Sequence, residues 1–233
     1  MHKIIVANYK MNGDKDFYLS LINKLNNIKV SDAEVILCPP FVYLPFFEKV
    51  DWCKLGAQTI TSQLNKKSTG EISPVMLKEF GVTNVIVGHS ERRAKGETDE
   101  QVAGKIKICL DSSINPIICV GEEDINDDIS FLADQVKRAV KDINVDSLTF
   151  AYEPVWAIGT GLVPSVERIN RAVEIIKKTA VSLGINAKVL YGGSVDGKNY
   201  LELLACDIDG FLCGGVSLRI DEFISIVKGV DNA

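Results

Sequence analysis

The chain has 233 residues, of which 46% are hydrophobic, and its 26 Lys and Arg residues against 31 Asp and Glu residues give a formal net charge of −5. This composition predicts a globular protein, and the acidic balance without a long basic run argues against nucleic acid or an anionic membrane as the main partner. We expect a single domain over residues 1–233, because α/β barrels of this size commonly stay single.

The N-terminal residues and the counts of histidine and cysteine narrow the class of protein. Met1-His2-Lys3 leads directly into an apolar run, with neither a signal peptide nor a segment long enough to span a bilayer, so we expect a cytoplasmic location. Only two histidines, His2 and His89, are present, which excludes a His-rich metal centre. The six cysteines are scattered without metal-site spacing, and most are expected to be small buried residues in a reducing compartment.

Eight short runs with strand character recur along the chain, at residues 3–7, 34–38, 54–57, 84–87, 116–120, 148–152, 187–191 and 208–212. The segments between them have the apolar periodicity of helices, for example over residues 129–143 and 166–180. Helix start signals agree with this alternation. Ser73-Pro74 predicts an N-cap followed by proline at the first helical position, and residues 98–101 predict a capping box.

This alternation predicts a closed (β/α)₈ barrel. Dividing 233 residues by eight gives about 29 residues per unit, close to the roughly 30 that a βαβ unit needs. Apolar strands separated by amphipathic helices are typical of a parallel sheet covered by helices, and eight units favour closure, with a doubly wound open sheet as the alternative. The longest irregular connection, residues 59–72, is polar with Lys66 and Lys67 at its middle, and its length predicts that it reaches another surface.

Polar residues follow three of the predicted strands at the points where those strands end. Asn8 and Lys10 follow the first strand, His89 follows the fourth, and Glu153 follows the sixth. The active site of a (β/α)₈ barrel is built from the loops at the C-terminal ends of its strands. We therefore expect these side chains to meet at one end of the barrel.

Glycine pairs follow the last two predicted strands, at residues 192–193 before Ser194 and at Gly214-Gly215. Their exposed backbone N–H groups can bind an anion near a helix N-terminus, and barrels commonly place phosphate at these two loops. The pairs alone could be simple turn formers. Their position beside the polar residues is what predicts a phosphate site.

Glu153 lies between a buried strand and a loop suited to movement. Pro154 favours an extended backbone at Glu153, so the carboxylate is expected at a rigid strand terminus. The following residues 155–158 are apolar, and Gly159 and Gly161 supply backbone freedom. The segment predicts a lid beside a candidate base.

Each of these residues also has a structural interpretation. Lys10 alone would be a solvated surface charge, and His89 a satisfied polar residue. Their joint placement at one barrel end argues for a site. Cys119 is interpreted as a packing residue rather than a nucleophile. Residues 90–93 read as a charged helix start, whose dipole favours Glu91 and disfavours an imidazolium.

Five segments resemble the triosephosphate isomerase family, and the resemblance runs from end to end of the chain. They are ANYKMNG at 7–13, GHSERR at 88–93, the Glu153 segment at 152–161, YGGS at 191–194 and GGVSL at 214–218. The resemblance implies that Glu153 is the catalytic base and His89 the electrophile. It further implies a substrate and phosphate site formed by Asn8, Lys10, Gly159, Ser194, Gly214 and Gly215, with supporting roles for Ser90 and Glu91.

The resemblance also implies an activity and an assembly. The activity is interconversion of dihydroxyacetone phosphate and glyceraldehyde 3-phosphate through an enediolate, in glycolysis and gluconeogenesis, with no cofactor and no metal. The assembly is a homodimer in which the loop Thr69-Gly70-Glu71 enters the neighbouring subunit's site. One residue and one segment depart from the family: Tyr9 stands where tryptophan is common, and Leu162-Val163-Pro164 occupies the trailing hinge of the lid, where a lysine and small residues are usual.

Two other functions remain open at the level of sequence. One is another phosphate-binding barrel enzyme, such as an aldolase or an indole-type synthase, although an aldolase needs a Schiff-base lysine near the barrel centre and the predicted strands are poor in interior lysine. The other is a catalytically silent barrel kept as a binding protein. The joint presence of Glu153, His89 and Lys10 argues against the silent barrel.

Overall fold

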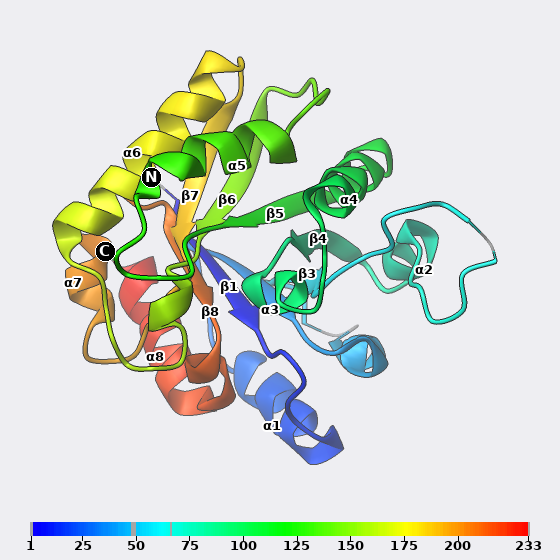
Figure 1. Ribbon diagram of the computed structural model, residues 1–233. Coiled ribbons are helices and arrows are strands. Elements are labelled where there is room, and N and C mark those ends of the chain that lie inside the picture. Colours follow the sequence, from blue (N-terminus) through cyan, green and yellow to red (C-terminus); the bar gives the residue numbers. More distant parts are fainter. Residues whose placement is uncertain (1, 48–49, 66, 233) are drawn as a thin grey trace.

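The computed structural model describes residues 2–47, 50–65 and 67–232. Eight parallel strands close into a barrel in which sequence neighbours pair and β1 pairs with β8 (Figure 1). The strands are β1 (Ile4–Asn8), β2 (Glu34–Cys38), β3 (Lys54–Ala57), β4 (Val82–Val87), β5 (Asn115–Val120), β6 (Ser147–Tyr152), β7 (Asn186–Tyr191) and β8 (Gly210–Cys213). The closed barrel confirms the predicted fold and excludes the open sheet.

Helices surround the strands (Figure 1). They are α1 (Lys15–Leu25), α2 (Pro74–Glu79), α3 (Ser90–Arg93), α4 (Asp99–Asp111), α5 (Leu132–Ala139), α6 (Val166–Ser182), α7 (Tyr200–Leu204) and α8 (Ile220–Asp231). Shorter 3₁₀ helices are Phe41–Phe47, Ile129–Phe131, Val155–Ala157 and Gly215–Leu218. Among the described residues, no helix combines the length and the apolar character that a bilayer crossing requires.

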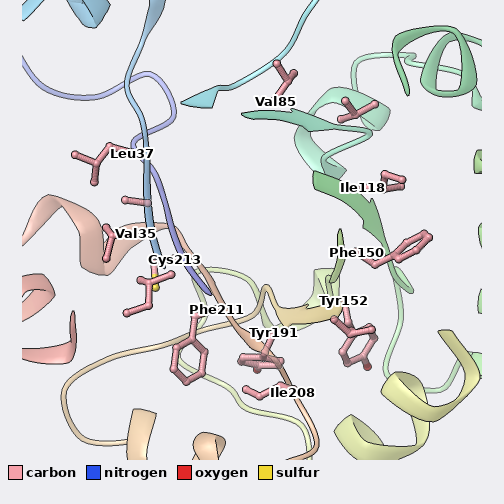
Figure 2. Close-up of a cluster of buried hydrophobic side chains, with 14 of the residues drawn as sticks. Val35, Leu37, Val85, Ile118, Phe150, Tyr152, Tyr191, Ile208, Phe211 and Cys213 are labelled. Atoms are coloured by element: carbon pink, nitrogen blue, oxygen red, sulfur yellow. The ribbon is translucent and has the colours of Figure 1, made fainter. Parts of the chain in front are cut away.

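Side-chain alternation along the strands divides the core into two clusters. The smaller cluster fills the barrel interior from alternate strand positions and consists of Ile4, Val6, Ile36, Cys38, Ile86, Ile117, Cys119, Ala151, Leu190 and Leu212. The larger cluster packs outward-facing strand residues against the helices, and Figure 2 shows part of it, including Val35, Leu37, Phe150 and Phe211. Because both sides of each strand are packed, the strand ends are rigid supports for the loops that follow them.

The helix start signals are confirmed. The Ser73 side chain accepts a hydrogen bond from the Met76 N–H ahead of Pro74, and Thr98 forms a reciprocal capping box with Gln101. The periodic segment at residues 129–143 differs from a continuous helix, because a 3₁₀ turn precedes α5 and the helix ends before Asp142, whose φ of +61° is left-handed. Apolar periodicity extends past the residues that keep helical dihedrals.

The connection at residues 59–72 leaves the barrel as a long loop between β3 and α2 (Figure 1). The Thr61 N–H donates to the Ile72 carbonyl at 3.1 Å, which closes the base of the loop. Lys105 on α4 is buried and donates to Thr59 Oγ1 at 2.7 Å, so a hydrogen bond joins the base of the loop to α4. Lys67 is exposed, whereas Lys66 lies outside the described residues.

Candidate active site

The ends of the strands bring the predicted polar residues together. Asn8 ends β1, Lys10 follows it by two residues, His89 follows β4 and Glu153 follows β6. All four line one cavity of about 270 Å³. Gly159, Ser194, Gly214 and Gly215 line the same cavity. Residues separated by up to 207 positions in sequence are therefore neighbours at one mouth of the barrel.

Glu153 is held at the rigid end of β6. Its backbone N–H donates to the Val120 carbonyl at 2.8 Å, and its residue surface is 2% exposed. One carboxylate oxygen lies 3.1 Å from His89 Nε2, and the other accepts the Ser90 N–H at 2.9 Å. Burial raises the pKa of Glu153 above its ordinary value of 4.5, and the favourable contacts with His89, Ser90 and Lys10 offset that rise only in part. The site thus holds a desolvated carboxylate, which suits a general base.

The hydrogen bonds of His89 indicate its tautomer. Nδ1 accepts the Glu91 backbone N–H at 3.1 Å, so the ring proton is assigned to Nε2, which faces Glu153. This arrangement is a neutral imidazole whose N–H points into the cavity.

Lys10 has a left-handed backbone, with φ of +52°, which is uncommon for a residue other than glycine. The Asn8 side chain stabilises this turn by accepting the Lys10 N–H at 3.0 Å. The Lys10 ammonium pairs with Glu91 at 2.8 Å. Partial burial alone would raise the pKa of Glu91, but the hydrogen bond and the charge of Lys10 bring it below its ordinary value.

The glycine positions at the mouth permit close approach. A Cβ on Gly192 would lie 3.1 Å from both the Glu153 Cγ and the Tyr152 carbonyl, and one on Gly193 would lie 2.2 Å from the Tyr191 hydroxyl. Ser194 Oγ donates to the Ala157 carbonyl at 2.7 Å and so ties this loop to the lid segment. In the second glycine pair, Gly214 caps the 3₁₀ helix Gly215–Leu218 and Gly215 is its first residue.

The lid segment starts as the 3₁₀ helix Val155–Ala157 and continues through Gly159 and Gly161, whose φ values of +71° and +78° are left-handed. A β-carbon at either glycine would be strained there. In the trailing hinge, the side chains of Leu162 and Val163 are exposed. The segment is apolar and glycine-hinged, as the sequence predicts; its motion stays a prediction.

Glu122 is the main functional candidate that the sequence analysis missed. It is fully buried after β5, and its Oε1 accepts hydrogen bonds from the Tyr152 hydroxyl at 2.7 Å, Trp156 Nε1 at 3.2 Å and Arg168 Nε at 3.2 Å. It therefore links the lid to α6 and to β6. The available signal was its position, since Gly121-Glu122 follows a strand just as Asn8 and Glu153 do.

The structure does not place Thr69, Gly70 and Glu71 at this chain's own cavity. They are exposed in the returning part of the 59–72 loop, just before Ile72, and Gly70 has a left-handed φ of +87°. Ser90 and Glu91, by contrast, contact Glu153 and Lys10 directly.

The cysteines near the site are packing residues. Cys119 and Cys213 are fully buried, and burial raises the pKa of the Cys213 thiol to about 12, so the unreactive thiol form predominates. Across the part of the chain that the structure describes, no group of three or more His, Cys, Asp and Glu side chains is arranged to hold a metal ion.

The fold and the site define a (β/α)₈ barrel enzyme whose carboxylate, imidazole and ammonium meet at the C-terminal mouth of the barrel. A family model of triosephosphate isomerase matches residues 3–230. The chain belongs to the triosephosphate isomerase family and is an isomerase.

Relatives match over nearly their whole length. Triosephosphate isomerase of Neurospora crassa is 40% identical over 95% of this chain and 96% of its own length. The enzyme of a Thermoanaerobacter species is 40% identical over 97% of this chain and 98% of its own, and that of Dehalococcoides mccartyi is 41% identical over 98% and 97%.

Proposed function

We propose that this isomerase interconverts dihydroxyacetone phosphate and glyceraldehyde 3-phosphate, as a cytoplasmic single-domain enzyme of glycolysis and gluconeogenesis. The names of its relatives support the substrate. The observation that carries the proposal is the buried Glu153 carboxylate, 3.1 Å from His89 Nε2 in a cavity that Lys10 also lines. A base, a hydrogen-bond donor and a cation around one small cavity are what proton transfer beside a carbonyl needs.

In the proposed mechanism, Glu153 removes a proton from the carbon beside the carbonyl group. His89 Nε2–H donates to the oxygen on which negative charge develops, and Lys10 adds positive charge nearby. A substrate oxygen that replaces Glu153 as the acceptor of this N–H frees the carboxylate to act as the base. Glu153 then returns the proton to the adjacent carbon, while the hydroxyl proton of the enediolate moves to the former carbonyl oxygen, so the hydroxyl-bearing carbon becomes the new carbonyl without a cofactor or a metal.

The lid completes the proposed mechanism. Closure of residues around Trp156 and Ile158 over the cavity would remove water from the Glu153 carboxylate, which strengthens the base, and would keep the intermediate from losing phosphate. The phosphate itself is assigned to the N–H groups of Gly159, Gly214 and Gly215 and to Ser194. Ile158 and these residues line the cavity.

The test is a coupled assay with dihydroxyacetone phosphate on the wild-type chain and on Glu153→Gln. Positioned base catalysis supplies about 10²–10⁴-fold, so the variant is expected to lose at least that much turnover while it stays folded. The matched control is Glu34→Gln, which removes a carboxylate paired with Lys54 at the other end of the barrel. Near-normal turnover of Glu153→Gln would remove Glu153 from the mechanism, and an inactive wild-type chain would contradict the proposed activity.

We also propose a homodimer that buries the tip of the 59–72 loop. Large apolar side chains are exposed near this loop and the first βα loop, with Met11 96%, Leu64 69% and Val75 67% exposed. Exposed apolar side chains mark an interface where they form one contiguous patch, and the proposed dimer requires that these do so. Deletion of Thr69-Gly70-Glu71 is expected to yield weakly active monomers by sedimentation and assay. A fully active monomer would argue against the dimer loop.

A further inference from the structure

Two cations line the substrate cavity, Lys10 and Arg219, and each has a carboxylate partner. Lys10 pairs with Glu91 at 2.8 Å. Arg219 pairs with Glu222 through Nε–Oε2 and through Nη2–Oε1, the second at 3.3 Å. The mouth of the cavity therefore has one ion pair near the reacting groups and another beside the glycine loops.

The backbone places Arg219 beside the second glycine pair. It directly follows the 3₁₀ helix Gly215–Leu218 and precedes α8, and its N–H donates to the Val216 carbonyl at 3.0 Å. Its side chain is 54% exposed. The guanidinium thus stands at the rim of the cavity, where an approaching ligand meets it.

Glu222 fixes the position of this guanidinium. Its Oε1 also accepts the Gly197 N–H at 2.8 Å, so the carboxylate connects α8 with the loop that carries the first glycine pair. That loop is further ordered by Asn199, whose side chain donates to the Ser194 carbonyl at 3.1 Å. Arg219 is consequently held between the two glycine loops.

We propose that Arg219 is a specificity-determining residue that attracts and retains the phosphate dianion of the substrate. This inference rests on the proposed function. The charged side chains that line the cavity are Lys10 and Arg219 against Glu153 and Asp196, two positive and two negative. Without Arg219 the lining would be net negative, which opposes the entry of a dianion.

The location of Arg219 also predicts which kinetic constant it controls. The glycine loops bind the phosphate, which does not change during proton transfer, so a charge beside them stabilises the bound substrate and the transition state equally. Such uniform binding changes KM and leaves kcat unaltered. An exposed charge is screened by salt, so the effect should weaken at higher ionic strength.

The experiment compares Arg219→Gln, Arg219→Lys and Glu222→Gln with the wild-type enzyme, by kcat and KM at ionic strengths of about 0.01 M and about 0.15 M, where the Debye length falls from about 30 Å to about 8 Å. Inorganic phosphate binding, by calorimetry, is measured on the same proteins. For Arg219→Gln we expect KM and the phosphate Kd to rise about three- to tenfold at low ionic strength, with kcat kept within about twofold. For Arg219→Lys, which keeps the positive charge, we expect KM and the phosphate Kd to stay close to the wild-type values.

Glu222→Gln separates an electrostatic role from a structural one. The Gln oxygen can still accept from both the Gly197 N–H and Arg219 Nη2, as Glu222 Oε1 does, so Arg219 keeps its position. The substitution removes only the negative charge beside Arg219, and KM should therefore be equal to or below that of the wild type. The proposal is overturned if Arg219→Gln leaves both KM and the phosphate Kd unchanged, or if Glu222→Gln raises them as much as Arg219→Gln does. Absence of isomerase activity in the wild type would refute the proposed function alone, since phosphate binding would still decide the role of Arg219.

Discussion

The two ends of the barrel are built from the same strands but differ in the burial of their ionisable groups. At the C-terminal end, Asn8, His89 and Glu153 are at most 6% exposed and converge on one cavity. At the N-terminal end, Lys54 and Lys188 are exposed beside the partly exposed Glu34 around a second cavity of about 300 Å³.

This difference indicates that the C-terminal end of the barrel lowers the stability of the fold, whereas the N-terminal end does not. A surface ion pair such as Glu34–Lys54 is solvated and nearly neutral in energy, whereas a desolvated carboxylate destabilises the fold unless it is fully compensated. Glu153 remains incompletely compensated, because its pKa stays raised despite its contacts. The C-terminal end therefore has features that packing alone does not explain.

The largest effect is expected from a truncation to alanine at His89, which follows β4, and its matched control is a truncation at Asn84 within β4. His89→Ala removes the proposed donor to the developing oxyanion, and loss of one such donor costs about 10²–10³-fold in kcat. Asn84→Ala removes a buried amide inside β4, toward its N-terminal end, where Nδ2 donates to Thr83 Oγ1 at 2.9 Å.

For Asn84→Ala we expect a loss of about 0.5–1.5 kcal/mol in the free energy of unfolding and unchanged turnover. Denaturant titration and the coupled assay measure both quantities on both variants. A comparable fall in kcat for Asn84→Ala would show that catalysis does not depend on the contrast between the two ends.

Substitution of Glu153 by Gln should change how the stability of the protein depends on pH. Because burial raises the pKa of Glu153 in the folded protein, the native state binds this proton more tightly than the unfolded chain does, and the free energy of unfolding falls as pH rises from 4.5 through the folded pKa. Glu153→Gln lacks this titration. Its free energy of unfolding should exceed that of the wild type by about 0.5–2 kcal/mol at neutral pH, the range of single stabilising substitutions, and by less near pH 4.5.

Denaturant titrations across that pH range measure the gap between the two proteins. A gap that stays constant or narrows as pH rises would mean that the Glu153 carboxylate is fully compensated in the folded state.

Much of the fold could be predicted because its signals are local. The apolar runs that end at Cys38 and Val120 have the composition of strands buried on both faces, and the capping box at Thr98 needs only four consecutive residues. Strand ends shifted by one or two residues: β1 extends to Asn8 and β8 begins at Gly210, because pairing between strands, rather than local preference, determines where a ladder ends.

The site was predictable to the extent that position along the chain implies position in a barrel. Asn8, His89 and Glu153 could be grouped because each follows a strand. The left-handed backbone of Lys10 and the tautomer of His89 could not, because each depends on a hydrogen bond between residues two positions apart that strand and helix patterns do not reveal. The role of Glu122 could not either, because it depends on contacts between segments distant in sequence. Glu122 illustrates this, since its three partners lie 30 to 46 residues away.

The smallest expected effect comes from Lys188→Gln, at the opposite end from Arg219. Both substitutions remove one exposed positive charge, but Lys188 is four residues before Gly192 on a strand, roughly 13 Å away at 3.3 Å per residue. This separation exceeds the Debye length of about 8 Å at physiological ionic strength, so the charge is screened from the cavity. We expect unchanged KM at about 0.15 M salt and a change in unfolding free energy within about 0.5 kcal/mol. If Lys188→Gln raised KM as much as Arg219→Gln, the net charge of the protein would determine substrate attraction. The position of the charge at one end of the barrel or the other would then not matter.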